Sequence, residues 1–263
     1  MTYTPVVPMS GIAGWTFLER TRDLQQQAYN QSQTVQNDVE YFAENIGKVE
    51  TAEQLVSDYR LLKVALGAFG LQDEIANKFF IQKVLADGVL ADDALANKVA
   101  DKTYYKLSEA FGFNSLTGPE TQTEGFAEKI TDAYMTRSFE IAVGEQDNAM
   151  RLAMNLDRDL ADLAESDMSE NARWYSIMGS EPLREVFDTA FGLSDYFAAL
   201  DVDKQLETYR DKADAYFGDE GVSQFADDEK RQELINLFLA RSEIASGISG
   251  YSPAHTALAL LGG

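Results

Sequence analysis

Three short segments of this chain end in the same way, and that shared ending constrains the fold more than any other feature. Each has Ala-Phe-Gly followed by an apolar residue, after a run with helical spacing: residues 68–71, 110–113 and 190–193. A helix often ends on a residue in the left-handed conformation, which glycine adopts without a Cβ penalty. We therefore predict three copies of one helix terminus, with the turning residue at Gly70, Gly112 and Gly192.

The residue after each glycine should fold back onto the last helical turn. The predicted contacts are Leu71 with Leu66, Phe113 with Leu107, and Leu193 with Phe187. The spacings are 42 residues from Ala68 to Ala110 and 80 from Ala110 to Ala190. They leave room for a helical-pair period of ~40 residues, but no copy stands near Met150. A solenoid is therefore not expected, while an old duplication stays open.

Helical periodicity fills most of the remaining chain, and no alternating run predicts a strand. Thr51 to Gln54 has the capping-box form that opens a helix. We expect an all-α fold, a multi-helix array of short amphipathic helices that end on glycines. The expected helices cover about residues 15–46, 51–69, 71–88, 92–99, 103–111, 125–142, 146–164, 170–178, 182–191, 201–217 and 227–244.

Glycine, proline and small residues suggest how the helices are grouped. Residues 114–124, which include Gly118-Pro119, form the best interior linker. The expected parts are a flexible N-terminal segment, a first helical subdomain, this linker, a second helical subdomain and a flexible C-terminal tail. Their ranges are 1–14, 15–113, 114–124, 125–245 and 246–263.

The first long helix carries an unusual number of amide side chains. These are Gln25, Gln26, Gln27, Asn30, Gln31, Gln33, Gln36 and Asn37. An apolar stripe for packing appears only later, at Val35, Val39, Phe42 and Ile46. We expect the amide-rich part to project, or to pack on another molecule.

Charge and composition exclude several classes of partner and location. The net charge of -22 would repel nucleic acid and anionic membranes, and it is typical of a solvated acidic surface. The first fifteen residues lack the charged and apolar regions of a secretory signal. No window approaches the ~18 apolar residues of a membrane span. We expect no membrane insertion, and a protein that stays in the cytoplasm or leaves by another route.

The residues that usually carry catalysis or hold metals are scarce. The chain has no cysteine, and its one histidine is His255. Zinc sites, di-iron sites and histidine triads are therefore not expected. No phosphate-binding glycine loop is present either. Asp157, Asp159, Asp201 and Asp203 lack the glycine and distal glutamate of a calcium loop. We predict no catalytic, cofactor-binding or metal-binding residue and no cofactor.

Large apolar side chains at helical spacing are expected in the core. This group includes Phe79, Phe80, Trp174 and the methionines at helical spacing, which we expect in the core rather than around a cofactor pocket. Arg60 lies between Tyr59 and Leu61, and a surface ion pair is its default role, with a buried carboxylate as the alternative.

Several segments together resemble an uncharacterised helical family of alpha-proteobacteria. The segments are residues 41–49, 55–62, 65–71, 80–85, 95–98 and 110–113. The resemblance is good over about residues 38–113 and looser beyond. That family is catalogued as a domain of unknown function, and its members are often encoded among flagellar genes. It carries no known chemistry, so the resemblance supplies no catalytic residue.

The resemblance implies a setting in flagellar structure or assembly. We expect a non-enzymatic helical protein that contacts other proteins, among them flagellar axial or export components, either in the cytoplasm or exported to the flagellum. Axial flagellar proteins are similar in having termini that become helical on assembly, and residues 1–17 and 246–263 would be the corresponding segments; frayed ends are the alternative. Three other functions stay open: a small-ligand sensor, a carboxylate-based enzyme and an acidic chaperone for a basic partner.

Overall fold

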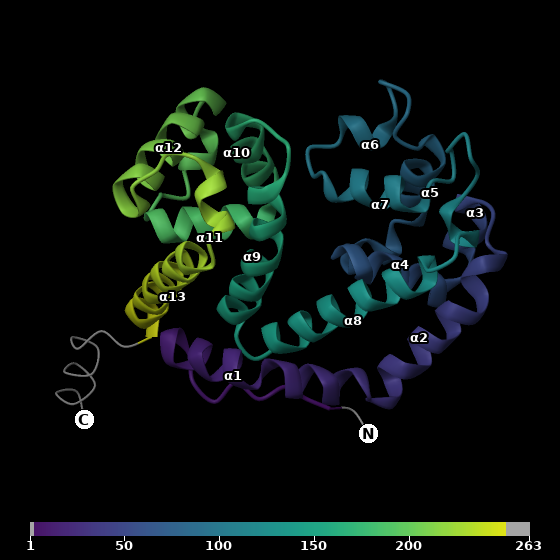
Figure 1. Ribbon diagram of the computed structural model, residues 1–263, viewed down its shortest axis with the longest axis horizontal. Helices are drawn as coiled ribbons and strands as arrows, with labels where there is room; N and C mark the ends of the chain where they lie inside the picture. The colour runs from purple at the N-terminus through teal and green to yellow at the C-terminus, as the bar shows by residue number, and fades with distance from the viewer. Residues whose placement is uncertain (1–2, 251–263) are drawn as a thin grey trace, which may run out of the picture. The chain divides into compact units, whose positions relative to one another are not determined.

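The structure is a computed structural model that describes residues 3–250. All regular elements within these residues are helical, which confirms the predicted all-α class (Figure 1). The first α-helices are α1 (Gly11–Asn30), α2 (Gln33–Asn45), α3 (Ala52–Ser57), α4 (Tyr59–Phe69), α5 (Lys78–Asp87), α6 (Leu95–Lys98) and α7 (Thr103–Phe111). The later ones are α8 (Phe126–Gly144), α9 (Asn148–Glu165), α10 (Glu170–Gly179), α11 (Glu181–Phe191), α12 (Val202–Phe217) and α13 (Asp228–Gly250).

Short 3-10 turns connect several of these helices. They are η1 (Ile46–Lys48), η2 (Gln72–Ala76), η3 (Glu120–Gln122), η4 (Phe197–Ala199) and η5 (Val222–Ala226). Two of them follow a predicted glycine terminus: η2 begins two residues after Gly70, and η4 begins five residues after Gly192. Exposed apolar side chains lie next to both turns: Tyr196 precedes η4, Leu200 and Val202 follow it, and Phe79 follows η2.

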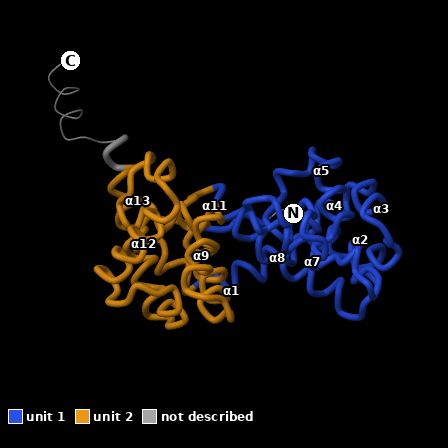
Figure 2. Tube along the Cα trace, turned by 90° about the horizontal axis from the view of Figure 1, so that it is seen from above, with its two compact units in different colours: residues 1–6, 21–145 blue, residues 7–20, 146–263 orange. Residues whose placement is uncertain are grey.

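The chain folds into two compact units (Figure 2). Unit 1 contains Met1–Val6 and Thr21–Glu145, and unit 2 contains Val7–Arg20 and everything from Gln146 on. The division therefore falls after α8 and not in the predicted linker 114–124. The reason is that α8 packs on α2 and α4, so the helix after the linker belongs to the same unit as the helices before it.

The three predicted glycine termini are confirmed. Gly70, Gly112 and Gly192 have φ of 76°, 58° and 66°, in the left-handed region. After Gly70, the Leu71 N–H donates to the Leu66 carbonyl at 2.9 Å, and after Gly192, the Leu193 N–H donates to the Asp188 carbonyl at 2.8 Å. These two ends have the Schellman pattern, whereas Gly112 makes the single bond, to Ser108, of the simpler left-handed end.

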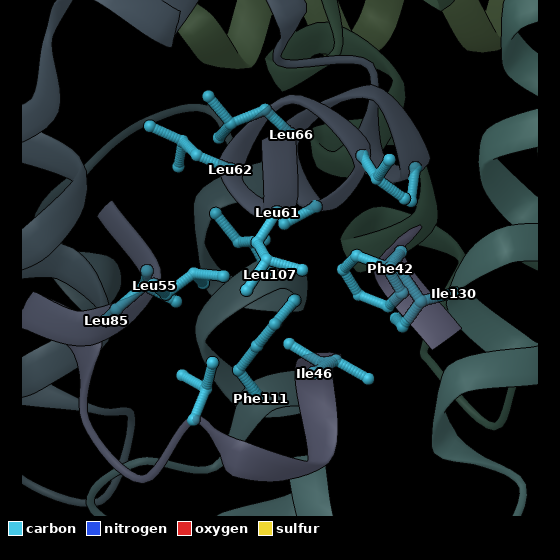
Figure 3. Close-up of a cluster of buried hydrophobic side chains, with 14 of the residues drawn as sticks. Phe42, Ile46, Leu55, Leu61, Leu62, Leu66, Leu85, Leu107, Phe111 and Ile130 are labelled. Carbon is cyan, nitrogen blue, oxygen red and sulfur yellow. The ribbon is translucent and has the colours of Figure 1, made fainter. Parts of the chain in front are cut away.

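Unit 1 is built around α4, one of its most apolar helices. Figure 3 shows Leu62 and Leu66 of this helix in the core with Phe42 of α2 and Ile130 of α8. Leu71, which follows the left-handed glycine, is buried in the same cluster. Burying each such side chain stabilises the fold by roughly 1.5–3 kcal/mol, so α4 anchors both of its neighbours.

Unit 2 has an aromatic core. The Trp174 indole stacks on the Tyr209 ring with centroids 5.5 Å apart, and Phe187 of α11 meets Trp174 edge-on at 5.4 Å. Phe225 of η5 then packs edge-on against Phe187 at 5.8 Å. Edge-on and stacked contacts add to the burial energy of large rings. The prediction that Trp174 belongs to the core is confirmed.

The first long helix differs from its prediction in where it begins and in being interrupted. It begins at Gly11, within the segment predicted to be flexible, because Trp15 and Leu18 are buried in unit 2. The helix then ends at Asn30, and Ser32, whose backbone is extended, is the N-cap residue of α2. The expected single helix over residues 15–46 is therefore two helices.

The C-terminal boundary also differs. The last helix was predicted to end at Ile244, but α13 continues to Gly250. The rest of the predicted tail, residues 251–263 with His255, lies outside the described residues.

Phe79 is not a core residue, contrary to the prediction. Its side chain is 81% exposed, and α5 instead buries Ile81, Val84 and Leu85. The sequence pattern placed Ile75, Phe79 and Val84 on one helix. The structure separates η2 from α5 at Asn77, which resets the helical register and turns Phe79 outward.

Gly70→Ala should test the role of the left-handed terminus. An L-residue in this conformation costs about 1–2 kcal/mol, and the added Cβ would lie 3.2 Å from Arg137 Nη1. We expect the free energy of unfolding to fall by that amount in urea titrations. Gly47→Ala is the matched control, because a Cβ there meets nothing closer than 4.0 Å, and it should change stability by less than ~0.5 kcal/mol. Equal effects of the two changes would contradict the assignment.

Candidate functional site

The amide side chains of α1 and α2 divide between the interior and the surface of unit 1. Gln25 is buried, where its Oε1 accepts the Val6 N–H at 2.6 Å and its Nε2 donates to the Val6 carbonyl at 3.2 Å. Gln36 donates to the Asn30 carbonyl at 2.7 Å and so ties the start of α2 to the end of α1. These two amides stabilise the fold. The amino-acid composition alone could not separate them from the exposed amides of the same stretch.

The other amides of α1 line a shallow groove on unit 1. The groove has a volume of about 440 Å³ and is lined by Asp23, Gln26, Gln27, Asn30, Gln31 and Met135. We call these residues the amide face. Gln26 Nε2 reaches Thr136 Oγ1 of α8 at 3.4 Å, which fixes one edge of the groove. The sequence predicted that this part projects or packs on another molecule, and its exposed half fits that expectation.

The chemistry of the amide face suits burial against another protein. Each amide carries donors and acceptors without charge, so covering it costs less desolvation than covering the carboxylates elsewhere on this acidic chain. The Asn30 Oδ1 atom is buried and has no hydrogen-bond partner within the described structure. Leu24, on the same part of α1, is 72% exposed. The exposed Leu24 side chain would give a partner apolar contact here, and the exposed Gln27 and Gln31 amides would give it hydrogen bonds, whereas the buried Asn30 Oδ1 atom is out of its reach.

A second groove lies where η1, η3 and the start of α8 meet in unit 1. It has a volume of about 640 Å³, and its lining is dominated by small or neutral side chains such as Ala43, Gly47, Thr121 and Gly125. Glu128 is the only charged side chain in the lining. One carboxylate without a partnered base or cation does not form an acid–base pair. The groove could accommodate a ligand by its shape, but its lining residues do not form a catalytic arrangement.

The strongest polar cluster of unit 1 centres on Asp38. Its Oδ2 accepts hydrogen bonds from Lys63 Nζ at 2.6 Å and from the Tyr134 hydroxyl at 2.9 Å. Burial raises the pKa of Tyr134, and the nearby Asp38 carboxylate raises it further. The phenol therefore stays protonated and donates to the carboxylate. The cluster joins α2, α4 and α8, and neither groove is lined by its residues.

Unit 2 contains a similar arrangement around Asp188. The Tyr209 hydroxyl donates to Asp188 Oδ1 at 2.5 Å, and Arg184 Nε lies 3.3 Å from Asp188 Oδ2. Burial again raises the pKa of the tyrosine, and its hydrogen bond to Asp188 adds to the effect. In both units a buried phenol, a carboxylate and a cation hold helices together. The two units therefore use the same combination of side chains to join helices, and packing alone accounts for its presence.

The residues considered for calcium serve other purposes. Asp157 pairs with Arg231 at 3.3 Å, Asp159 pairs with Arg158 at 2.8 Å, and Asp201 caps α12. Among the described residues, no group of three or more His, Asp or Glu side chains is arranged to hold a metal ion.

Two further expectations can be compared with the structure. Arg60 was expected in an ion pair; its guanidinium instead lies 3.8 Å from the Tyr41 ring centroid and donates to the Asn37 carbonyl at 2.7 Å. Within residues 3–250, no helix has the length and apolar character needed to cross a membrane.

Tyr134→Phe should show that the Asp38 cluster stabilises the fold. Removing the hydroxyl takes one hydrogen bond from a nearly buried carboxylate, so we expect the free energy of unfolding to fall by about 1–2 kcal/mol. Tyr105→Phe is the control, because the Tyr105 hydroxyl bonds Glu109 at the surface, and it should have an effect below ~0.5 kcal/mol. Urea unfolding measures both, and an unchanged Tyr134→Phe protein would contradict the structural role.

Comparisons with known proteins place the chain in a family but give no activity. Residues 68–230 match the family model described as "Protein of unknown function (DUF1217)". Among solved structures, a crystal structure of a protein from Agrobacterium tumefaciens has a TM-score of 0.74 and 24% sequence identity; the match covers 92% of this chain and 99% of that one. At this identity the likeness shows the fold alone. No curated protein matches the chain. Because the family model spans more than half of its residues, the chain belongs to the DUF1217 family of proteins of unknown function.

Proposed function

We propose that this chain is a non-enzymatic helical protein of flagellar structure or assembly that acts by contacting other proteins. The observation that carries the proposal is the amide face, an amide-rich groove whose only charged lining residue is Asp23, on an otherwise strongly acidic chain. The flagellar setting is supported by the resemblance of segments such as residues 41–49 and 65–71 to family members that are often encoded among flagellar genes. The two observations are independent of each other.

A protein partner explains the amide face better than a small ligand does. The groove is shallow, and ligand pockets usually enclose most of a small molecule and converge a few polar groups on it. Its polar side chains are spread along two turns of α1, from Asp23 to Gln31, with exposed Leu24 on the same part of the helix. A partner chain lying along the helix could contact all of them.

An acidic chaperone is the second candidate, because the net charge of -22 favours association with a basic protein. This function would keep the chain in the cytoplasm. A flagellar structural component would instead be exported. The two candidates therefore differ in where the protein accumulates.

The location of the tagged protein tests the setting. We would compare cells, culture medium and sheared filaments in strains with and without the flagellar export apparatus, together with the swimming of a deletion strain. Export that depends on the apparatus supports a structural component. Cytoplasmic retention with impaired swimming supports an assembly factor. Normal swimming and normal flagella in the deletion strain would contradict both forms of the proposal.

Gln27→Lys/Gln31→Lys should test the amide face itself. Two added cations would have to be desolvated in the proposed contact, so we expect the variant to lose most of its ability to restore swimming to the deletion strain while its thermal stability is unchanged. Thr34→Lys/Ala91→Lys adds the same charge at exposed positions outside the groove and should restore swimming fully. Full restoration by the first variant would remove the amide face as the contact surface.

A further inference from the structure

The turn after Gly192 in unit 2 presents apolar side chains to solvent. Tyr196 is 84% exposed, and Leu200 and Val202, which follow η4, are 46% and 53% exposed. We call these three residues the Tyr196 platform. Single exposed apolar residues are ordinary, but three of them around one short turn form a patch that a partner could cover.

The backbone that carries the Tyr196 platform is fixed from beneath. Phe197 of η4 is buried and meets the Tyr209 ring edge-on, with centroids 5.3 Å apart. The buried Gln205 side chain donates from Nε2 to the carbonyls of Leu200 at 2.7 Å and Ala198 at 3.3 Å. Arg184 Nη2 in turn donates to Gln205 Oε1 at 2.6 Å.

This anchoring matters for binding. A turn held by a buried amide and a buried ring has already lost much of its conformational entropy, so a partner does not have to order it. Buried polar interactions therefore hold the η4 turn in place, while the apolar side chains next to it are exposed to solvent. Folding alone does not require those side chains to be apolar.

Exposed carboxylates stand next to these apolar residues along the turn. Asp195 precedes Tyr196, and Asp201 and Asp203 flank Val202; all three residues are exposed. Asp201 also accepts the Asp203 N–H at 3.0 Å as the cap of α12, which fixes its position. Lys204 is the nearest cation in sequence. The patch is therefore apolar at its centre and acidic at its edges.

We propose that the Tyr196 platform docks a basic amphipathic helix of a partner protein. Such a helix presents an apolar stripe with lysine and arginine on both sides, which complements an apolar patch edged by carboxylates. Nucleic acid and anionic membranes carry the wrong charge for this surface. The inference deepens the proposed function by giving the chemistry of one partner, and it rests on that function only for its biological setting.

Unit 1 shows a related feature at the equivalent place. There η2 begins two residues after Gly70, whereas η4 begins five residues after Gly192, and the second residue of the next helix is the exposed Phe79. The acidic edge is less developed, because Lys78 stands beside Phe79. We therefore place the docking site on unit 2.

Binding of a fluorescent peptide would test the proposal. The probe is an amphipathic helix of leucine and lysine, and the control peptide has the lysines replaced by glutamate; anisotropy is measured with the full chain at 50 to 300 mM salt. We expect Tyr196→Ser/Leu200→Ser to weaken binding of the lysine peptide at least ~10-fold. Tyr59→Ser/Leu90→Ser, which removes apolar side chains that are 59% and 63% exposed on unit 1, should leave it within about twofold.

The other arms separate specific docking from general attraction to an acidic protein. Asp195→Asn/Asp203→Asn should reduce both affinity and salt dependence. Hydrogen exchange on the unmodified protein should show protection of residues 194–203 when the lysine peptide binds. The proposal would be overturned if both serine variants lost the same affinity for the lysine peptide, or if the glutamate peptide bound as tightly. It would also be overturned if hydrogen-exchange protection appeared elsewhere in the chain, or if the protein bound anionic vesicles instead. The localisation experiment uses different readouts, so failure here would leave the flagellar setting and the amide face intact.

Discussion

The structure depends on helices that end at a defined residue, where the chain turns toward the next element. Gly70 and Gly192 provide these stops by adopting the left-handed conformation, and the residue after each one closes the last helical turn with a backbone hydrogen bond. Each glycine is also covered by a guanidinium from a helix that packs across it, Arg137 over Gly70 and Arg241 over Gly192. A cation at a helix C-terminus is favourable because it faces the unpaired carbonyl groups.

The two units use these stops in the same order. In each, a helix (α4 or α11) ends on the left-handed glycine, a 3-10 turn follows, and another helix begins. Each of these helices also supplies a cation that pairs with a carboxylate. In unit 1, Lys63 of α4 pairs with Asp38, which also accepts from Tyr134. In unit 2, Arg184 of α11 pairs with Asp188, which also accepts from Tyr209. This repetition is what an old duplication would leave, although the core of unit 1 is largely aliphatic and that of unit 2 largely aromatic.

The features that the sequence predicted correctly are local. A left-handed glycine, a capping box at Thr51 and the helical class depend on neighbouring residues, and all three are present. The features that it missed depend on the rest of the fold. Phe79 turns outward because η2 resets the register, and Gln25 is buried because its amide pairs with Val6, 19 residues away. The amide face could be anticipated from composition, but the Tyr196 platform could not, since exposure follows from packing.

The surface proposed as a docking site in unit 2 is an extension of these buried interactions. Arg184 contacts Asp188 through Nε and Gln205 through Nη2, so one guanidinium connects the buried tyrosine to the turn beneath Tyr196. Tyr209 contributes twice, through its hydroxyl to Asp188 and through its ring to Phe197. A change in the core of unit 2 would therefore alter the shape of the platform as well as the stability of the unit. Surfaces held this way suit a protein that works by presenting fixed contacts to a partner, because the energy that orders them is supplied by folding and not by binding.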